Sequence, residues 1–278
     1  GEPLMRADWR ELILAMRSRR LSYRVLTNGA AVSAEDVRFL RDTSASAVDV
    51  SVYAPPEAIA ADGTPLHDCI TGVAGSLDKT LAAVDAMRSA GLKVFLKSPI
   101  FALNYRWAGE LRRFAEGLGC GFIGDTTFVR PAGGFSEDFR ALSSGELLEF
   151  FTGTLKLDRS ALAENPSGNL CGDITCSAGR STLRVRPDGA VTPCIAIPDV
   201  VARARGDEIA EAWKSQPALD ALRGLSLSGL PECLACPEHP QCVRCPGMAV
   251  EESGDVRGAT PATCVRTKVL ARLRRQDG

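Results

Sequence analysis

The sequence predicts an α/β fold in its first half, followed by a smaller cysteine-rich region. Strand-like and helix-like segments alternate over roughly the first 130 residues, and eight of the ten cysteines fall after residue 170. Repeated βα units of this length specify a parallel sheet with right-handed crossovers, in either an open doubly wound sheet or part of a βα barrel. In either case the ligand site lies at the carboxyl ends of the strands.

Hydrophobic periodicity places four helices and four strands in the first half. Asp8 is the expected cap of a first helix, whose apolar face contains Trp9, Leu12, Ile13 and Met16. Ser33 and Ser76 start the second and third helices, and a fourth lies around 106–118. The predicted strands are 23–27, 48–53, 92–97 (ended by Pro99) and about 122–129. The Pro/Gly-rich connection 54–75 is long enough to be a functional loop.

The second half has shorter predicted elements. Helical character at 146–156 precedes a hairpin of 182–186 and 190–192, whose turn signal is Asp188-Gly189. Short helices are expected at 209–215 and 218–225, and the basic residues 268–275 fit the end of a terminal helix. Because few large apolar residues separate the cysteines, bound metal would supply much of the folding free energy here. We expect two domains, 1–140 and 141–278.

Composition narrows the class of partner. The 278 residues are 45% hydrophobic and 24% charged, with a net charge of −1, which is ordinary for a globular protein. This charge gives no reason to expect nucleic acid or an anionic membrane as a partner. No apolar run reaches the roughly 18 residues of a membrane span. Clustered thiols fit the reducing cytoplasm better than a secreted disulfide framework.

Eight cysteines are spaced as metal ligands. Residues 233–245 form a C-x2-C-x5-C-x2-C array, and the full set is Cys171, Cys176, Cys194, Cys233, Cys236, Cys242, Cys245 and Cys264. Thiolates so gathered select zinc or iron–sulfur clusters, and eight is twice the ligand count of a 4Fe–4S cluster. Zinc remains the alternative, and His239 inside the array could complete such a site. Cys69 and Cys120 stand alone and are expected to be ordinary buried thiols.

Several short motifs together resemble radical S-adenosylmethionine (radical SAM) enzymes. Gly1-Glu2-Pro3 resembles the end of their Gly-Gly-Glu-Pro motif, and 26–29, 50–53 and 71–77 follow at the family's distances. The cysteine order of the second half resembles the SPASM extension of the same superfamily. The resemblance covers nearly the whole chain. One departure is Cys242-x2-Cys245, where the family usually has three intervening residues.

The resemblance implies a partial βα barrel of the radical SAM type, followed by a SPASM extension with two auxiliary 4Fe–4S clusters. The inner cluster would be held by Cys171, Cys176, Cys194 and Cys245, and the outer one by Cys233, Cys236, Cys242 and Cys264. The cofactor S-adenosylmethionine would contact Gly1, Glu2, Pro3, Asn28 and Ser51. Three of these five also have a purely structural interpretation: a solvated carboxylate at Glu2, a turn at Asn28 and a small strand residue at Ser51.

Two departures limit what the resemblance implies. The family's radical chemistry needs a C-x3-C-x2-C loop for a third cluster, and no such triplet occurs in these residues. We therefore expect a chain that lacks the first βα units, that cannot make a radical alone, and whose strand 23–27 has lost a neighbour. Ile195 stands where one branch of the family has a catalytic Asp, so the catalytic acid or base stays unassigned. His67-Asp68 is either an acid/base pair or a loop-ordering pair.

The leading hypothesis is an N-terminally truncated radical SAM/SPASM oxidoreductase. In complete form it would cleave S-adenosylmethionine reductively and abstract hydrogen from a peptide or protein, in the maturation of a ribosomally made peptide. The cofactor carries that chemistry. Auxiliary clusters would transfer electrons or coordinate substrate, with flavodoxin or ferredoxin as the electron donor. The alternative is a non-catalytic scaffold or binding module that zinc or clusters stabilise.

Overall fold

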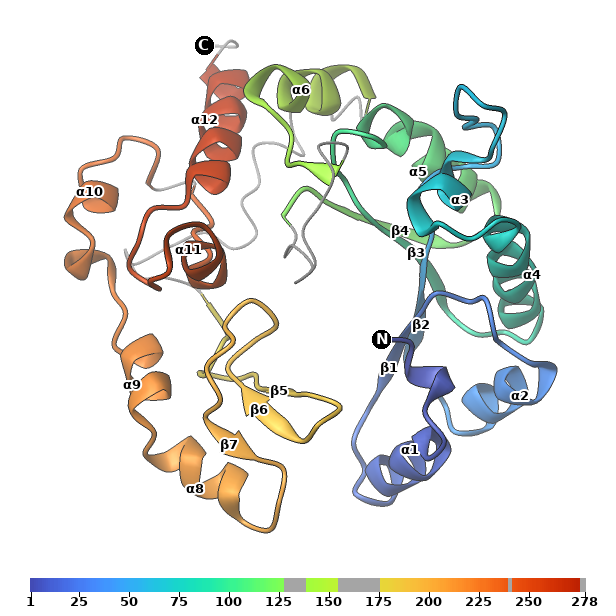
Figure 1. Cartoon of the computed structure of the whole chain (residues 1–278), viewed down its shortest axis with the longest axis horizontal. Coiled ribbons are helices and arrows are strands. Elements are labelled where there is room, and N and C mark those ends of the chain that lie inside the picture. Colours follow the sequence, from blue (N-terminus) through green and yellow to red (C-terminus); the bar gives the residue numbers. More distant parts are fainter. Residues whose placement is uncertain (128–138, 155–175, 240–241, 276–278) are drawn as a thin grey trace. The chain divides into compact units, whose positions relative to one another are not determined.

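The computed structural model describes residues 1–127, 139–154, 176–239 and 242–275, which form two compact units (Figure 1). The described residues of the first unit are 1–127, 139–141 and 152–154, and those of the second are 142–151, 176–239 and 242–275. The expected boundary at 140 falls where the chain alternates between the units. Each unit is therefore described by itself.

A parallel sheet with the order β1-β2-β3-β4 is the centre of the first unit. Its strands are β1 (Arg24–Thr27), β2 (Ala47–Ser51), β3 (Val94–Pro99) and β4 (Gly121–Asp125). Val25 lies opposite Val48, which in turn lies opposite Val94. The predicted parallel α/β fold is confirmed. Among the described strands β1 pairs with β2 alone and lies at the edge of the sheet.

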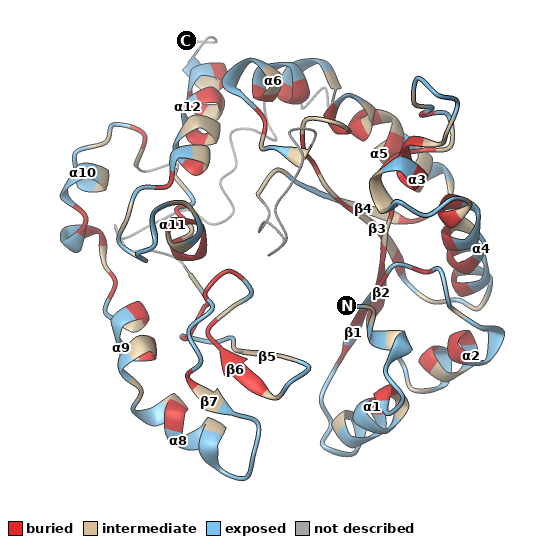
Figure 2. Cartoon of the chain, in the orientation of Figure 1, coloured by how far each residue is buried: buried red, intermediate tan, exposed pale blue. Residues whose placement is uncertain are grey.

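The long helices of the first unit all lie on one face of this sheet (Figure 1). They are α1 (Trp9–Ser18), α2 (Ala34–Asp42), α4 (Ser76–Ser89) and α5 (Ala108–Gly117), and the short helices are η1 (Pro3–Met5), α3 (Leu66–Thr71) and η2 (Tyr105–Trp107). Their buried sides pack on the valines and leucines of the strands (Figure 2). Helices on one face only are the arrangement of a βα barrel, whereas a doubly wound sheet has them on both.

Three local predictions were wrong. Asp8 makes no capping hydrogen bond and instead forms an ion pair with Arg6, while Leu12 is 47% exposed. The connection 54–75 is not all loop, because it contains α3. By contrast, Pro99 ends β3 as predicted and is itself the last residue of the strand. A proline is tolerated there because only the end of the strand loses a backbone donor.

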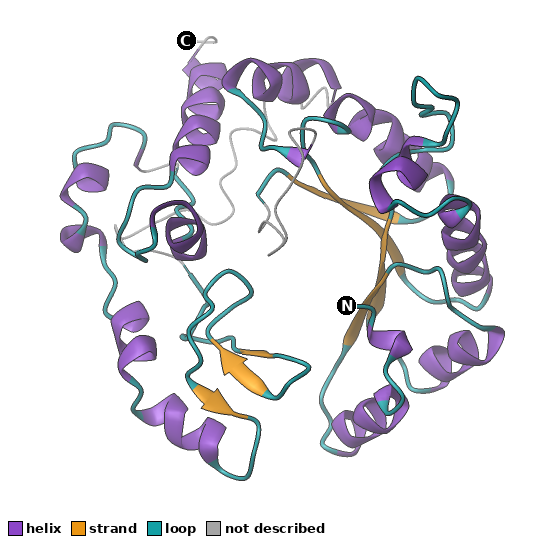
Figure 3. Ribbon diagram, viewed as in Figure 1, coloured by secondary structure: helices purple, strands orange, loops and turns teal. Residues whose placement is uncertain are grey.

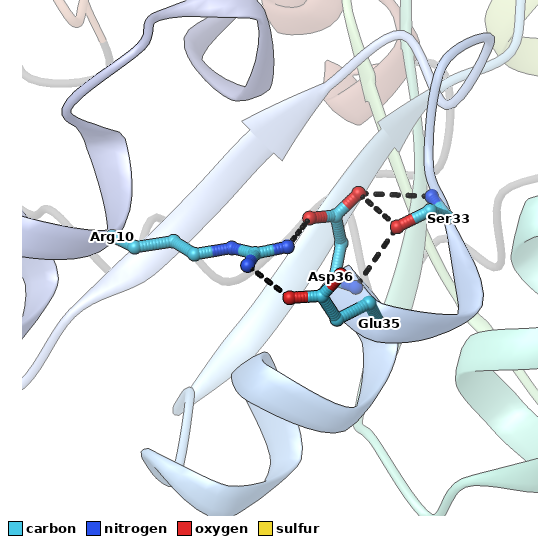
Figure 4. A network of polar contacts seen from close by, with 4 residues as sticks. All are labelled: Arg10, Ser33, Glu35 and Asp36. Carbon is cyan, nitrogen blue, oxygen red and sulfur yellow. Dashed lines mark hydrogen bonds and ion pairs between the residues drawn. The ribbon is translucent and has the colours of Figure 1, made fainter.

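A polar network joins α1 to α2 (Figure 4). Ser33 caps α2 as predicted: its hydroxyl accepts from the Asp36 amide at 3.1 Å, and Asp36 accepts in return from the Ser33 amide at 2.9 Å. Arg10 of α1 donates to Asp36 at 2.7 Å and also pairs with Glu35. Burial alone would raise the pKa of Asp36, but the bonds from Arg10 and Ser33 outweigh it and hold that pKa below its usual value. The capping box thus also anchors the first helix.

The second unit is built from short elements around a small antiparallel sheet (Figure 3). Strands β5 (Arg184–Val185) and β6 (Ala190–Thr192) form the predicted hairpin, and β7 (Ala202–Arg203) adds a third strand that was not expected. The helices are α6 (Ser144–Glu149) with the π-helical turn η4 (Phe150–Thr154), α8 (Glu208–Lys214), α9 (Pro217–Arg223), η5 (Leu227–Gly229), α10 (Pro231–Leu234), α11 (Pro246–Ser253) and α12 (Pro261–Arg275). None of the helices in the described parts combines the length and the apolar character that crossing a membrane requires.

Two of the apolar cores described in the second unit are small and partly lined by cysteine. One consists of Ala178, Ile197 and Leu222, with Cys176 and Cys194 packed against it. Another is formed by Leu225 and Leu230, with Cys176 and Cys233 beside them. Cores of two or three buried side chains stabilise little by themselves. This agrees with the expectation that bound metal contributes to folding here.

Candidate metal centres

Four of the predicted ligands line one cavity in the second unit. Its volume is about 250 Å³, and its thiols are Cys233, Cys236, Cys242 and Cys264. Cys233 lies in α10, and the Cys236 amide donates to the Cys233 carbonyl at 3.1 Å, so one tight turn presents both sulfurs. Cys264 is in the first turn of α12, where its amide donates to the Thr260 carbonyl at 2.9 Å. We call this cavity the outer site.

The outer site is electrostatically prepared for a positive group. Burial raises the pKa of Cys242, and nearby Cys264, Cys233 and Cys236 raise it further, while a hydrogen bond from Thr267 opposes them. The Thr267 hydroxyl lies 3.6 Å from the Cys242 sulfur. Gathered thiolates repel one another unless a cation neutralises them. Such hydroxyl contacts to a ligating sulfur are typical of the surroundings of metal sites.

The thiols line a cavity and do not meet at a point. Among the described residues, no three His, Cys, Asp or Glu side chains converge as the ligands of one metal ion do. Sulfurs on a tetrahedral zinc ion would lie about 3.8 Å apart, given Zn–S bonds of about 2.3 Å. The four thiols of the cavity match the ligand count of one 4Fe–4S cluster.

A second thiol group involves Cys176, Cys194 and Cys245. Burial raises the pKa of Cys176 and the charges of Cys245 and Cys194 add to it, which places the three within electrostatic reach. Gly247, in the first turn of α11, lies between two of them. A side chain there would put its Cβ 3.5 Å from the Cys194 sulfur and 3.6 Å from that of Cys245. We call this group the inner site. The fourth predicted ligand, Cys171, lies outside the described residues.

In the first unit, Glu2 is bound to the carboxyl end of β1. Its carboxylate accepts from the Thr27 hydroxyl at 2.8 Å, the Asn28 amide at 2.6 Å and the Leu4 amide at 3.2 Å. The side chain is therefore held at the strand end and not merely solvated. Gly1 and Pro3, beside it, are exposed.

The other predicted cofactor contacts lie near the neighbouring strand ends. Exposed Asn28 follows β1, and its carbonyl accepts from Thr80 of α4 at 2.8 Å. Half-buried Ser51 ends β2 and lies opposite Lys97 of β3. Burial raises the pKa of Tyr53, and a hydrogen bond with Ser51 partly offsets the effect. The parallel register thus brings polar groups to one edge of the sheet, where such folds bind ligands.

His67 and Asp68 have structural partners. The His67 Nδ1 accepts from the Tyr53 amide at 3.2 Å, and burial lowers the pKa of this imidazole. Asp68 accepts from the amides of Gly75 and Leu77 at 2.6 and 2.8 Å. Burial alone would raise the pKa of Asp68, but these bonds hold it below its usual value. Asp68 thus caps α4 from α3, which fits the loop-ordering interpretation.

Comparisons with known proteins agree with this arrangement. A family model described as SPASM, an iron–sulfur cluster-binding domain, matches residues 176–246. An AdoMet-dependent heme synthase of Nitratidesulfovibrio vulgaris is 20% identical over 290 residues, which cover 94% of this chain and 76% of the relative. The heme synthase of Oleidesulfovibrio alaskensis is 23% identical over 119 residues, or 43% of this chain and 29% of the relative. The match thus spans less than a third of that second enzyme.

Solved structures share the fold at low sequence identity. The protein anSMEcpe with bound AdoMet has a TM-score of 0.71 at 15% identity, over 100% of this chain and 80% of that one. SuiB of Streptococcus suis bound to S-adenosylmethionine has a TM-score of 0.63 at 14% identity, over 95% of this chain and 64% of SuiB. The chain contains a SPASM domain at residues 176–246 and shares the fold of these two proteins.

The residues of this SPASM domain fit iron–sulfur clusters. Thiolates are the ligands that such clusters need, and two spatially distinct thiol groups stand in the second unit. The hydroxyl of Thr267 and the side chain of Arg244 surround the outer thiols. Sequence reasoning missed both residues. No spacing rule marks them, because their place beside the sulfurs depends on how α12 and the loop before it fold.

Proposed function

We propose that this chain belongs to an enzyme that modifies a peptide or protein by radical chemistry. When bound, S-adenosylmethionine and a C-x3-C-x2-C cluster supply reductive cleavage and hydrogen abstraction. The observation that carries the proposal is the separation of the cysteines into two thiol groups in the second unit, joined to a barrel-like sheet in the first. We place the enzyme in the cytoplasm, with flavodoxin or ferredoxin as its electron donor.

The ligand sets belong to this proposal. The outer 4Fe–4S cluster would be held by Cys233, Cys236, Cys242 and Cys264, and the inner one by Cys171, Cys176, Cys194 and Cys245. The cavity shared by the first four thiols supports the outer set. The inner set is supported by the effect of Cys194 and Cys245 on the pKa of Cys176 and by the place of Gly247 between the Cys194 and Cys245 sulfurs. Glu2 would hold the amino group of S-adenosylmethionine, helped by the backbone of Gly1 and Pro3, while Ser51 and Asn28 would flank its carboxylate or ribose.

A peptide substrate is supported by two structural neighbours. Structures of anSMEcpe contain AdoMet with a Cp18Cys or a Kp18Cys peptide, and SuiB has been solved with its precursor peptide SuiA. Their TM-scores with this chain lie between 0.64 and 0.70. The alternative is a heme-forming reaction, which is supported by the names of the two curated relatives.

Metal analysis tests the central proposal. Anaerobic reconstitution of the 278-residue chain should load about eight irons with matching sulfide, twice the four of one cluster. The brown protein should absorb broadly near 400 nm. A colourless form that holds two zinc ions and takes up no iron would refute the proposed iron–sulfur clusters. It would favour a non-catalytic scaffold that zinc stabilises.

An activity assay tests the need for the C-x3-C-x2-C cluster, and a heme titration tests the substrate class. The isolated chain should bind S-adenosylmethionine but release no 5′-deoxyadenosine under strong reductant, because its 278 residues contain no C-x3-C-x2-C triplet. Detection of 5′-deoxyadenosine from this polypeptide would show that the C-x3-C-x2-C triplet is not required for cleavage. Titration with hemin separates the two substrate classes. Saturable one-to-one binding would favour the heme-forming reaction, whereas its absence favours the peptide.

A further inference from the structure

Arg244 is the buried cation of the outer site. It stands between Cys242 and Cys245, is 8% exposed and lines the cavity that holds the four outer thiols. Its Nη2 donates to the Val256 carbonyl at 2.9 Å and to the Gly258 carbonyl at 2.6 Å. Both carbonyls belong to the loop between α11 and α12, so the guanidinium plane is fixed from one side.

The other side of this guanidinium has no partner in the described part of the chain. Its Nε and Nη1 are buried, and neither donates a hydrogen bond to any described atom. An arginine carries five N–H donors in a rigid fork, so fixing Nη2 also fixes the direction of the remaining three. A buried donor without a partner is costly, and more so when it is charged. The arrangement therefore indicates an acceptor inside the cavity.

The charge of Arg244 points to an anionic acceptor. Glu238, the buried acid of the same cavity, pairs through Oε1 with Arg275 of α12 at 2.5 Å. Within the described residues Arg244 itself forms no ion pair with a carboxylate. Lys268 and His239 also line the cavity, and neither can neutralise the Arg244 cation, because neither side chain carries negative charge. The Oε2 of Glu238 is also buried without a hydrogen-bond partner, but the charge of this carboxylate is already paired with Arg275. The negative groups of the cavity that have no cation beside them are therefore the four thiolates and whatever they hold.

We propose that Arg244 donates N–H hydrogen bonds to sulfur of the outer cluster and thereby raises its reduction potential. This inference rests on the proposed outer 4Fe–4S site. Four thiolates around an oxidised [4Fe–4S]²⁺ core give a net charge of −2, and uptake of one electron gives [4Fe–4S]⁺ and −3. No bond to the protein breaks. A fixed, desolvated guanidinium stabilises the more negative state, since hydrogen bonds to sulfur and net charge set such potentials.

The unmodified protein provides the first test. The chain is produced with ¹⁵N-labelled arginine, reconstituted anaerobically and reduced with dithionite, and the cluster signals are examined by pulsed electron paramagnetic resonance. We expect a ¹⁵N hyperfine coupling that disappears when Arg244→Lys is labelled in the same way. A reduced outer cluster without any arginine coupling would overturn the proposal. This readout needs no altered protein to fold.

Potentiometry provides the second test. In a Cys194→Ala background, which removes the inner cluster, Arg244→Gln should lower the equilibrium constant for reduction at least tenfold, or 59 mV for one electron. Arg244→Lys keeps the positive charge but loses the planar fork of donors. The reduction potential of its outer cluster should lie between that of the protein with Arg244 and that of Arg244→Gln. The matched control is Arg180→Gln, because Arg180 is also held by two carbonyls, those of Leu222 and Leu225, but does not line the outer cavity.

The outcomes separate this inference from the proposed function. About four irons retained with an unchanged potential in Arg244→Gln would sink the role of Arg244 and leave the cluster assignment standing. If Arg244→Gln fails to take up iron, the ¹⁵N coupling of the unmodified chain decides. If the unmodified protein binds zinc in place of iron, the proposed function on which the inference rests is refuted.

Discussion

Single carboxylates anchor the ends of elements in the first unit. Glu2 collects three hydrogen bonds at the end of β1, and Asp68 collects three at the start of α4, from Gly75, Leu77 and the Ser76 hydroxyl at 2.8 Å. Backbone amides at a helix start or a strand end have no partner within the element, so a carboxylate that satisfies them stabilises both segments. Two residues therefore fix the geometry of an edge where ligands of this fold bind.

The first expectation concerns Glu2. Glu2→Gln keeps the size of the side chain but removes its charge and weakens its three contacts, so affinity for S-adenosylmethionine should fall about tenfold, equivalent to about 1.4 kcal/mol. Isothermal titration of the reconstituted chain measures this. Glu11→Gln, an exposed acid in the first turn of α1, is the control and should bind normally. Equal affinities for both variants would remove Glu2 from the cofactor site.

A second expectation concerns Asp68. Asp68→Asn should lower the free energy of unfolding of the first unit by about 1–2 kcal/mol, the usual worth of a helix cap. Denaturant titration followed by circular dichroism measures the change. Asp78→Asn is the control, since Asp78 is exposed in the same helix turn. A loss no larger than that of the control would contradict the capping role.

The depressed pKa of Asp68 also sets the sign of a pH effect. The ordinary value of such a carboxyl is 3.8, and the folded value lies below it. The stabilisation is therefore fully present above about pH 4 and is lost as the pH falls through the folded value. The difference between unmodified protein and Asp68→Asn should shrink below pH 4. A difference that grows on acidification would mean that the carboxylate is not the stabilised form.

At the scale of elements, periodic segments were predictable and brief ones were not. The Ser33 start of α2 and the buried Val48 and Val50 of β2 follow from local signals that the tertiary structure preserves. Helix α3 has only six residues, and β7 has two, so neither carries a measurable period. Leu12 fits the helical stripe of α1 but is half exposed, because no neighbouring element of the described chain covers that side.

The packing of Phe95 on β4 yields a third expectation. A Cβ added at Gly121 would lie 2.3 Å from the Phe95 ring, which the Arg24 guanidinium covers at 4.5 Å. Arg24 in turn pairs with buried Asp49, so the ring cannot easily move away. Gly121→Ala should therefore destabilise the first unit by about 1–3 kcal/mol. Denaturant midpoints measure it.

The control for this expectation is another glycine of the same βα unit. Gly117 ends α5 and has open space where a Cβ would stand. Gly117→Ala should be neutral or stabilising by up to about 1 kcal/mol, because alanine favours the helix. If the two alanine variants have the same denaturant midpoint, the Phe95 ring can move away from residue 121 at no cost in free energy.

At the scale of the whole molecule, cysteine spacing predicted where metal would bind, and folding determines what surrounds it. The array around Cys233 and Cys236 is visible in the sequence because a C-x2-C turn is local. Cys264 is brought to it by α12, and Arg244 by the carbonyls of a loop, and these contacts bridge 12 to 31 positions. The tuning groups of a cluster site therefore escape sequence reasoning even when its ligands do not.

Removal of single thiols tests the grouping. Cys236→Ala should lose the outer cluster and Cys194→Ala the inner one, and each variant should retain about half of the iron. Cys245→Ala should resemble Cys194→Ala, although Cys245 belongs to the array in sequence. Iron analysis and resonance spectra of the three variants provide the comparison. Different surviving clusters in Cys194→Ala and Cys245→Ala would disprove the interleaved assignment.

Metal removal should affect the two units unequally. Among the described residues, the two apolar cores beside Cys176 have only two or three buried side chains each, whereas the sheet of the first unit buries a continuous core. Chelation should therefore remove hydrogen-exchange protection from residues 176–275 and leave β2 and β3 protected. Cys69 is exposed, not buried as the sequence predicted, and lies outside both groups, so Cys69→Ser should leave the pattern unaltered. Uniform loss of protection would mean that the first unit depends on metal as well.

The grouping of Cys194 with Cys245 across Gly247 has a consequence for how the protein is made. Synthesis proceeds from the amino terminus, so Cys233, Cys236 and Cys242 leave the ribosome before Cys245 can join the inner group. Once Cys245 has followed, the nascent chain offers the four thiols of the array, which under the proposed assignment belong to two different clusters. Iron delivered then would be trapped among the wrong ligands. Correct loading thus favours delivery after α12 has emerged, when both groups can close together.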